Sequence, residues 1–261
     1  MLNKTGMIAG AILVGLLILM ALFASILTTH DPIAIDPAVR LSPPTQQNPF
    51  GTDNLGRDML SRILYGWRTT LFIGFLAMLI ALVAGAILGM AGGVLEDVAG
   101  SFGKVVNKVF ICTARFLSAG PGILLAIAIA VASVYNRGGY LGRATGIALL
   151  LVPGFIRVFG GVAPCFRDKT VKHAILMVLA QISLSIALAI LVCAGLGYLG
   201  LVVQPPTPEL GALIGSSREF LRVGSYLLLF PGLLLGVSAL SFNILGESLN
   251  AHLLVVHYKK R

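Results

Sequence analysis

The most regular feature of the chain is a series of long stretches with few or no charged residues, separated by polar segments. A transmembrane α-helix needs about 20 consecutive, mostly apolar residues, and six stretches are candidates. They are residues 5–30, 69–95, 116–136, 144–161, 173–208 and 223–246. The fourth is interrupted by Arg157, whose side chain we expect to snorkel toward the membrane interface. The pattern predicts an all-α, polytopic membrane protein with about six transmembrane helices.

The first stretch has an apolar core from Met7 to Leu27. A secretory signal has a core of only about 7–15 residues. Ala21 and Ala24 also lack the small-x-small spacing of a usual cleavage site. We therefore expect a retained first helix.

Composition supports a membrane protein. The chain is 57% hydrophobic and 11% charged, with mean hydropathy +0.95, whereas soluble domains carry about 25% charged residues. The net charge of +9 comes from scattered basic residues, which form no stripe for nucleic acid. The three cysteines and four histidines lack paired spacing, so we expect no disulfide framework, metal site or cofactor.

The lysines indicate an orientation. With both termini in the cytoplasm, all seven lysines fall on the cytoplasmic side, and six of ten acidic residues fall on the other. This agrees with the tendency of positive residues to stay inside. We expect residues 31–67 to form an external polar loop and residues 162–172 a short basic cytoplasmic loop.

The external loop contains Gly51-Thr52-Asp53-Asn54-Leu55-Gly56-Arg57-Asp58, the densest polar patch of the chain. Its two glycines predict a tight turn with unusual backbone angles, and Asp58 is placed to cap a helix that begins at Met59. Residues 51–56 match the start of a phosphate-binding loop, but Arg57-Asp58 replaces the required Lys-Ser/Thr. On spacing alone, an ordinary turn in a solvated loop remains the alternative.

Small residues recur on the second predicted span. Gly85, Gly89 and Gly93 are spaced by four, which places them on one helix face where a second helix can approach closely. Glycine is common in membrane helices, so the spacing alone is weak evidence for packing.

Residues 48–66, Asn-Pro-Phe-Gly-Thr-Asp-Asn-Leu-Gly-Arg-Asp-Met-Leu-Ser-Arg-Ile-Leu-Tyr-Gly, closely resemble the permeases of dipeptide, oligopeptide and nickel ABC importers, specifically the C-type subunit. Matches over residues 120–128, 196–212 and 230–247 keep the same order, and the resemblance covers roughly residues 5–250. It implies a type I importer permease whose partners are a B-type permease, two ATP-binding subunits and an external substrate-binding protein.

The chain departs from this family in the cytoplasmic loop before the fifth span. The family carries a Glu-Ala-Ala…Gly pattern there, in a short helix that docks in the ATPase. This chain lacks the pattern in a shorter segment, which starts near Pro164 and can hold about one or two helical turns. Phe166, Arg167, Asp168 and Lys169 are the candidate remnant of the coupling contact, and a plain basic loop is the alternative. Cys193 is a second departure, because we expect a glutamate there.

These observations lead to two hypotheses. The first is a permease subunit, without enzymatic activity of its own, in the bacterial cytoplasmic membrane. The second is an uncoupled structural relative that has lost its ATPase-docking helix. An intramembrane enzyme is disfavoured, because the spans contain no catalytic grouping. We divide the chain into residues 1–67 (first helix and external loop), 68–248 (five-helix core) and 249–261 (basic tail).

Overall fold

The computed structural model of the chain describes residues 2–28, 30–98, 139–167 and 171–258, together with scattered residues between 100 and 132. All regular elements in these ranges are helices, which confirms the predicted all-α class. The α-helices are α1 (Leu2–Leu22), α2 (Ala24–Leu27), α3 (Met59–Val98), α6 (Gly139–Arg167), α7 (Val171–Tyr198), α8 (Leu210–Ser217) and α9 (Tyr226–Tyr258). Two short 3-10 helices are η1 (Pro37–Val39) and η2 (Arg218–Phe220).

Five of these helices are long and apolar enough to cross a membrane. The candidate spans are Thr5–Leu22, Met59–Leu95, Gly139–Gly161, His173–Tyr198 and Tyr226–His252. They correspond to five of the six predicted stretches, including the fourth with Arg157. The remaining stretch, the third (residues 116–136), lies outside the continuously described ranges.

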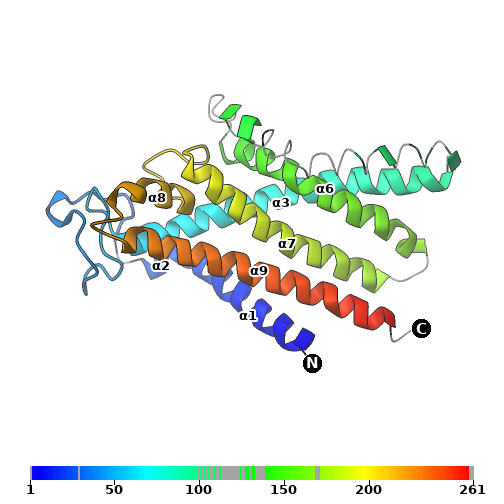
Figure 1. The fold of residues 1–261 in the computed structure, drawn as a ribbon, viewed down its shortest axis with the longest axis horizontal. Helices are drawn as coiled ribbons and strands as arrows, with labels where there is room; N and C mark the ends of the chain where they lie inside the picture. Colours follow the sequence, from blue (N-terminus) through cyan, green and yellow to red (C-terminus); the bar gives the residue numbers. More distant parts are fainter. Residues whose placement is uncertain are drawn as a thin grey trace.

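Helices α3 and α6 run in the same direction, side by side (Figure 1). Gly85 lies against Phe155, and Gly89 lies against Ile156 and Phe159, so residue numbers rise together along the two helices. The predicted third span lies between α3 and α6 in the sequence, outside the continuously described ranges, and it stays a prediction.

Helix α7 lies between α6 and α9, and α1 packs along α9 in the opposite direction (Figure 1). The backbone of α1 approaches α9 closely, since a Cβ on Gly10 would lie 2.9 Å from the Leu245 nitrogen. Helix α1 meets α3 at the buried Trp67, whose Nε1 donates a hydrogen bond of 2.8 Å to the Leu17 carbonyl. The resulting core contains buried apolar side chains from α1, α3, α6, α7, α8 and α9.

Two local expectations are corrected by the helices. The fourth predicted stretch begins after Arg143, but this arginine lies inside the helix, because α6 starts at Gly139. The segment expected to become a loop from residue 162 continues as α6 through Pro164 to Arg167. Proline is tolerated in membrane helices because neighbouring groups satisfy the freed carbonyl, so Pro164 does not end the helix.

Helix α3 is longer than one membrane crossing. Its 40 residues correspond to about 60 Å at 1.5 Å per residue, against a hydrocarbon layer of about 30 Å. The part before Phe72 continues beyond the start of α6, since Phe72 packs edge-to-face on Tyr140 at 6.0 Å between ring centroids. This extension carries the loop of residues 30–58 and α8 at one end of the bundle (Figure 1).

Candidate functional site

The polar string found in the sequence lies in a compact loop, which we call the motif loop (residues 41–58). Gly51 and Gly56 both have positive φ, +73° and +78°, as the sequence predicted. A Cβ on Gly56 would lie 1.8 Å from the Asp36 carbonyl oxygen, so only glycine fits there. Thr52 and Asp58 form an antiparallel bridge that closes the turn.

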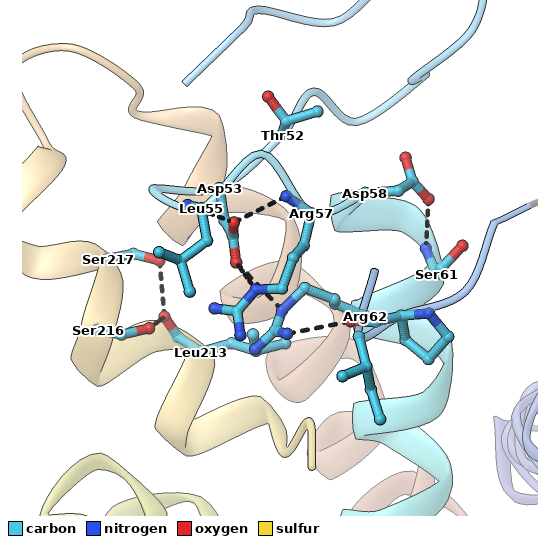
Figure 2. A network of polar contacts seen from close by, with 12 residues as sticks. Thr52, Asp53, Leu55, Arg57, Asp58, Ser61, Arg62, Leu213, Ser216 and Ser217 are labelled. Carbon is cyan, nitrogen blue, oxygen red and sulfur yellow. Dashed lines mark hydrogen bonds and ion pairs between the residues drawn. The ribbon is translucent and has the colours of Figure 1, made fainter. Parts of the chain in front are cut away.

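Asp53 is the centre of the motif loop (Figure 2). Its Oδ1 accepts hydrogen bonds from the backbone nitrogens of Leu55 and Arg57, at 2.8 and 3.0 Å. Its Oδ2 accepts from Arg57 Nε at 2.7 Å and forms an ion pair with Arg62 Nε at 3.4 Å. The carboxylate is buried, and two guanidinium groups compensate its charge.

Arg62 extends this network to the segment before the motif loop, because its Nη1 donates to the Pro32 carbonyl at 3.1 Å. Asp58 caps α3, as predicted: its Oδ2 accepts from the Ser61 nitrogen at 2.8 Å. Its Oδ1 accepts from Asn48 Nδ2 at 3.0 Å. The charged residues of the motif thus bind their own loop and helix.

Thr52 connects the loop to α9. Its buried hydroxyl accepts from the Ser42 nitrogen at 2.9 Å and donates to the Val39 carbonyl. Tyr226, the first residue of α9, donates its hydroxyl hydrogen to the Ser42 carbonyl at 2.8 Å. The motif loop is therefore fixed to the ends of both α3 and α9.

Glu209 is a buried acidic residue that the sequence analysis did not single out. It caps α8, accepting from the Gly211 and Ala212 nitrogens at 2.9 and 2.8 Å, and its Oε1 lies 3.0 Å from the Thr70 hydroxyl of α3. Burial raises the pKa of its carboxyl, and these three hydrogen bonds oppose the rise. The sequence feature that could have identified Glu209 as a helix cap is its position as an isolated acidic residue directly before the apolar run of residues 210–214.

Glycines make room for this buried acid. A Cβ on Gly197 would lie 1.9 Å from Glu209 Oε2, and one on Gly211 would lie 2.0 Å from the Ala194 carbonyl oxygen. Glu209 thereby joins α3, α7 and α8 at the end of the bundle that carries the motif loop.

A cavity of about 810 Å³ lies below this end of the bundle. Its wall is mainly apolar and aromatic, with a few polar side chains from α3 and the 199–209 loop. The lining residues are Ile18, Ala21, Leu22, Tyr65, Arg68, Thr69, Leu71, Phe72, Phe75, Tyr140, Ile186, Thr207 and Phe242. Its volume lies within the range of about 300–1,000 Å³ that small-molecule sites occupy. The cavity is separate from the internal pairs of the motif loop, since none of the charged residues of that loop lines it.

The other predicted site residues lie elsewhere. Gly85 and Gly89 contact α6, where a Cβ on Gly85 would lie 2.3 Å from the Phe155 Cβ. Gly93 lies further along the same helix. Phe166 and Arg167 are the last residues of α6, at the opposite end of the bundle from the motif loop. Asp168 and Lys169 lie outside the described residues.

Cys193, the second departure from the family pattern, is fully buried in α7. It is part of the hydrophobic core, so an apolar thiol occupies the position where a glutamate was expected.

Comparison with known proteins identifies the family. Residues 2–44 match the model of the N-terminal transmembrane domain of oligopeptide transport permease C. The dipeptide transport system permease protein DppC of Alkalihalophilus pseudofirmus is 34% identical over 93% of this chain and 83% of its own length. The probable D,D-dipeptide permease DdpC of Escherichia coli is 29% identical (93% and 85%), and the glutathione permease GsiD of Pectobacterium atrosepticum is 30% identical (93% and 84%). The chain belongs to the family of C-type permeases of peptide ABC importers.

Proposed function

We propose that this chain forms part of the pathway by which peptides cross the cytoplasmic membrane. The observation that carries the proposal is the 810 Å³ cavity among α1, α3, α6, α7 and α9, in a chain that dipeptide permeases match along 93% of its length. An apolar, aromatic wall with Tyr65, Arg68, Thr69 and Thr207 suits a small peptide, which has both apolar side chains and charged ends. Nickel is the alternative cargo, but none of the described residues that line the cavity is a histidine, a cysteine or an acidic residue that could bind it.

The proposed assembly contains a B-type permease, two ATP-binding subunits and an external substrate-binding protein. The motif loop faces outward and both termini face the cytoplasm, as the lysine distribution favours. Rocking of the two permeases against each other would expose the cavity alternately to the two sides. The rigidly fastened motif loop would then move with α3 and α9 as one body.

Coupling to ATP hydrolysis is proposed to occur at the end of α6, where Phe166, Arg167, Asp168 and Lys169 replace the family's docking helix. The second candidate function is an uncoupled structural subunit. The absence of the Glu-Ala-Ala pattern from residues 157–173 favours this alternative, so a measurement of coupling has to decide between them.

The test is to purify this chain together with a B-type permease, two ATP-binding subunits and a substrate-binding protein of the same transport system, and to measure ATP hydrolysis in liposomes. A coupled permease gives a stable complex whose hydrolysis rises when dipeptide-loaded binding protein is added. The double variant Arg167→Ala/Lys169→Ala should lose this rise, while Arg222→Ala, an exposed arginine at the opposite end, should keep it. A complex with the B-type permease that does not bind the ATPase would establish the uncoupled alternative.

A further inference from the structure

A second cavity, of about 380 Å³, lies at the end of the bundle opposite the motif loop. Three polar side chains from three different helices line it: Arg157 of α6, Gln181 of α7 and Asn250 of α9. In Figure 1 the end of α6, the start of α7 and the end of α9 lie together at this end. The remaining lining residues are Gly154, Val158, Gly161 and Met177. We call this cavity the Arg157 pocket.

The Arg157 pocket lies close to the membrane boundary. Arg157 is four residues from the end of its span at Gly161, and Asn250 is two residues from the end of its span at His252. At 1.5 Å per residue these distances are about 6 and 3 Å. Gln181 is eight residues, or about 12 Å, from the start of its span at His173, so the pocket extends from the expected headgroup boundary into the span.

Among the described residues, the guanidinium of Arg157 has one hydrogen-bond partner in this pocket. Its Nε donates to the Pro153 carbonyl at 3.2 Å, which anchors the base of the guanidinium. In the described part of the chain, no carboxylate lies within ion-pair distance of it. A charged side chain inside a span is costly unless it pairs or reaches a polar group. Arg157 is exposed, so its two terminal nitrogens are accessible to an anion from outside the chain.

The two amides are positioned to bind the same anion. Gln181 donates from Nε2 to Ser185 Oγ at 3.1 Å, which fixes its orientation. Gly154 allows this amide to approach α6, because a Cβ there would lie 2.4 Å from Gln181 Nε2. Asn250 is exposed beside them. Its side chain forms no hydrogen bond or ion pair with another residue in the described part of the chain. An arginine fork with neighbouring amide groups is suited to phosphate oxygens.

We propose that the Arg157 pocket binds the phosphate of an anionic phospholipid headgroup. A lipid is favoured over free phosphate because the pocket lies between membrane helices at headgroup depth and has the apolar walls of Val158 and Met177 for an acyl chain. Basic pockets between transmembrane helices recognise lipid headgroups in this way. The bound lipid holds α6, α7 and α9 together at the end of the bundle where α6 stops. The site is independent of the proposed transport cargo.

The experiment uses the full-length chain in a mild detergent, with phosphatidylglycerol as the anionic lipid. Native mass spectrometry measures retained phosphatidylglycerol, and thermal unfolding measures the shift in midpoint on adding phosphatidylglycerol, phosphatidylcholine or sodium phosphate. We expect Arg157→Gln to reduce phosphatidylglycerol affinity about tenfold, as expected for the loss of a charge-assisted hydrogen bond. Arg143→Gln is the matched control, because it removes the same charge from the other end of α6.

A second variant, Asn250→Asp, guards against a folding defect in Arg157→Gln. It places a negative charge on an exposed position of the pocket, and we expect it to weaken phosphatidylglycerol binding while leaving the unfolding midpoint without lipid within about 2 °C of the wild type. Equal retention of phosphatidylglycerol by wild type, Arg157→Gln and Asn250→Asp would overturn the proposal. A midpoint raised by sodium phosphate but not by phosphatidylglycerol would also overturn it, since the source would then be a free anion.

Discussion

The motif loop depends on the buried carboxylate of Asp53, and replacing it with asparagine tests this dependence. Asparagine keeps one acceptor oxygen for the Leu55 and Arg57 nitrogens, which Asp53 Oδ1 now accepts at 2.8 and 3.0 Å. It loses the charge and the acceptor for Arg57 Nε at 2.7 Å, and it leaves Arg62 without its ion-pair partner. A hydrogen bond between charged groups contributes about 1.5–3 kcal/mol. The side chains of Asp53 and Arg57 are both about nine-tenths buried, so we expect a loss of about 2 kcal/mol in the local stability of the loop.

Amide hydrogen exchange measures this local stability directly, because loops open without global unfolding. A loss of about 2 kcal/mol corresponds to about 30-fold faster exchange. The informative amides are those of Leu41, Thr52, Asp53 and Gly56, which donate hydrogen bonds inside the loop at 3.0–3.1 Å. Asp36→Asn is the matched control, because Asp36 is exposed and an asparagine keeps its bond from the Ala38 nitrogen.

We expect the control to exchange within about twofold of the wild type. If the same amides in Asp53→Asn also exchange within about twofold of the wild-type rate, the account of the loop is refuted. A 30-fold increase confined to residues 41–58 would support it.

Three further variants test other contacts. Gly56→Ala should destabilise the loop by more than the roughly 1–2 kcal/mol that a left-handed backbone costs a residue other than glycine, because its Cβ would lie 1.8 Å from the Asp36 carbonyl oxygen. Thermal unfolding measures the loss, and Gly232→Ala is the control, since a Cβ at that position meets open space. Glu209→Gln tests the raised pKa of that carboxyl. The contribution of this buried acid to folding stability is fully present below its ordinary pKa of 4.5, and it is lost as pH rises through the raised pKa of the folded state. The variant cannot titrate at this position, so its unfolding midpoint should depend less steeply on pH between about pH 4 and 8. An unchanged slope would contradict the burial argument. Trp67→Phe removes the 2.8 Å hydrogen bond to the Leu17 carbonyl and some core volume, so we expect the free energy of unfolding to fall by about 1–3 kcal/mol. Protease cleavage at the α1 end should become faster than in the wild type. An equal cleavage rate would show that α1 is held by other contacts.

Much of the fold follows from the length of the stretches without charged residues. Stretches of 20 residues or more placed the first, second, fifth and sixth predicted spans on α1, α3, α7 and α9. The fourth was found although Arg157 interrupts it, because an arginine near a helix end can reach the interface. Helix ends were less predictable: α3 begins at Met59 and continues through Arg62 and Arg68, since its charged first turns pack on the loop and α8 rather than on lipid.

The site was predictable where local backbone chemistry decides it. Gly51, Gly56 and the Asp58 cap follow from turn and capping rules. The partners of Asp53 and Glu209 did not follow, because Arg62, Thr70 and Gly197 meet these acids only through the packing of α3, α7 and α8. Helix continuation through Pro164 also depends on tertiary surroundings that local propensity does not contain.

The most direct test of the central claim is ATP-driven uptake of a radiolabelled dipeptide into liposomes that contain the complete complex. Thr69→Trp adds bulk inside the 810 Å³ cavity, and Leu233→Trp adds the same residue to a 57% exposed position on α9. The account predicts uptake by the wild type and by Leu233→Trp, and at least a tenfold loss with Thr69→Trp while the complex still assembles. Uptake that persists in Thr69→Trp, or in a complex without this chain, would contradict a pathway through this cavity.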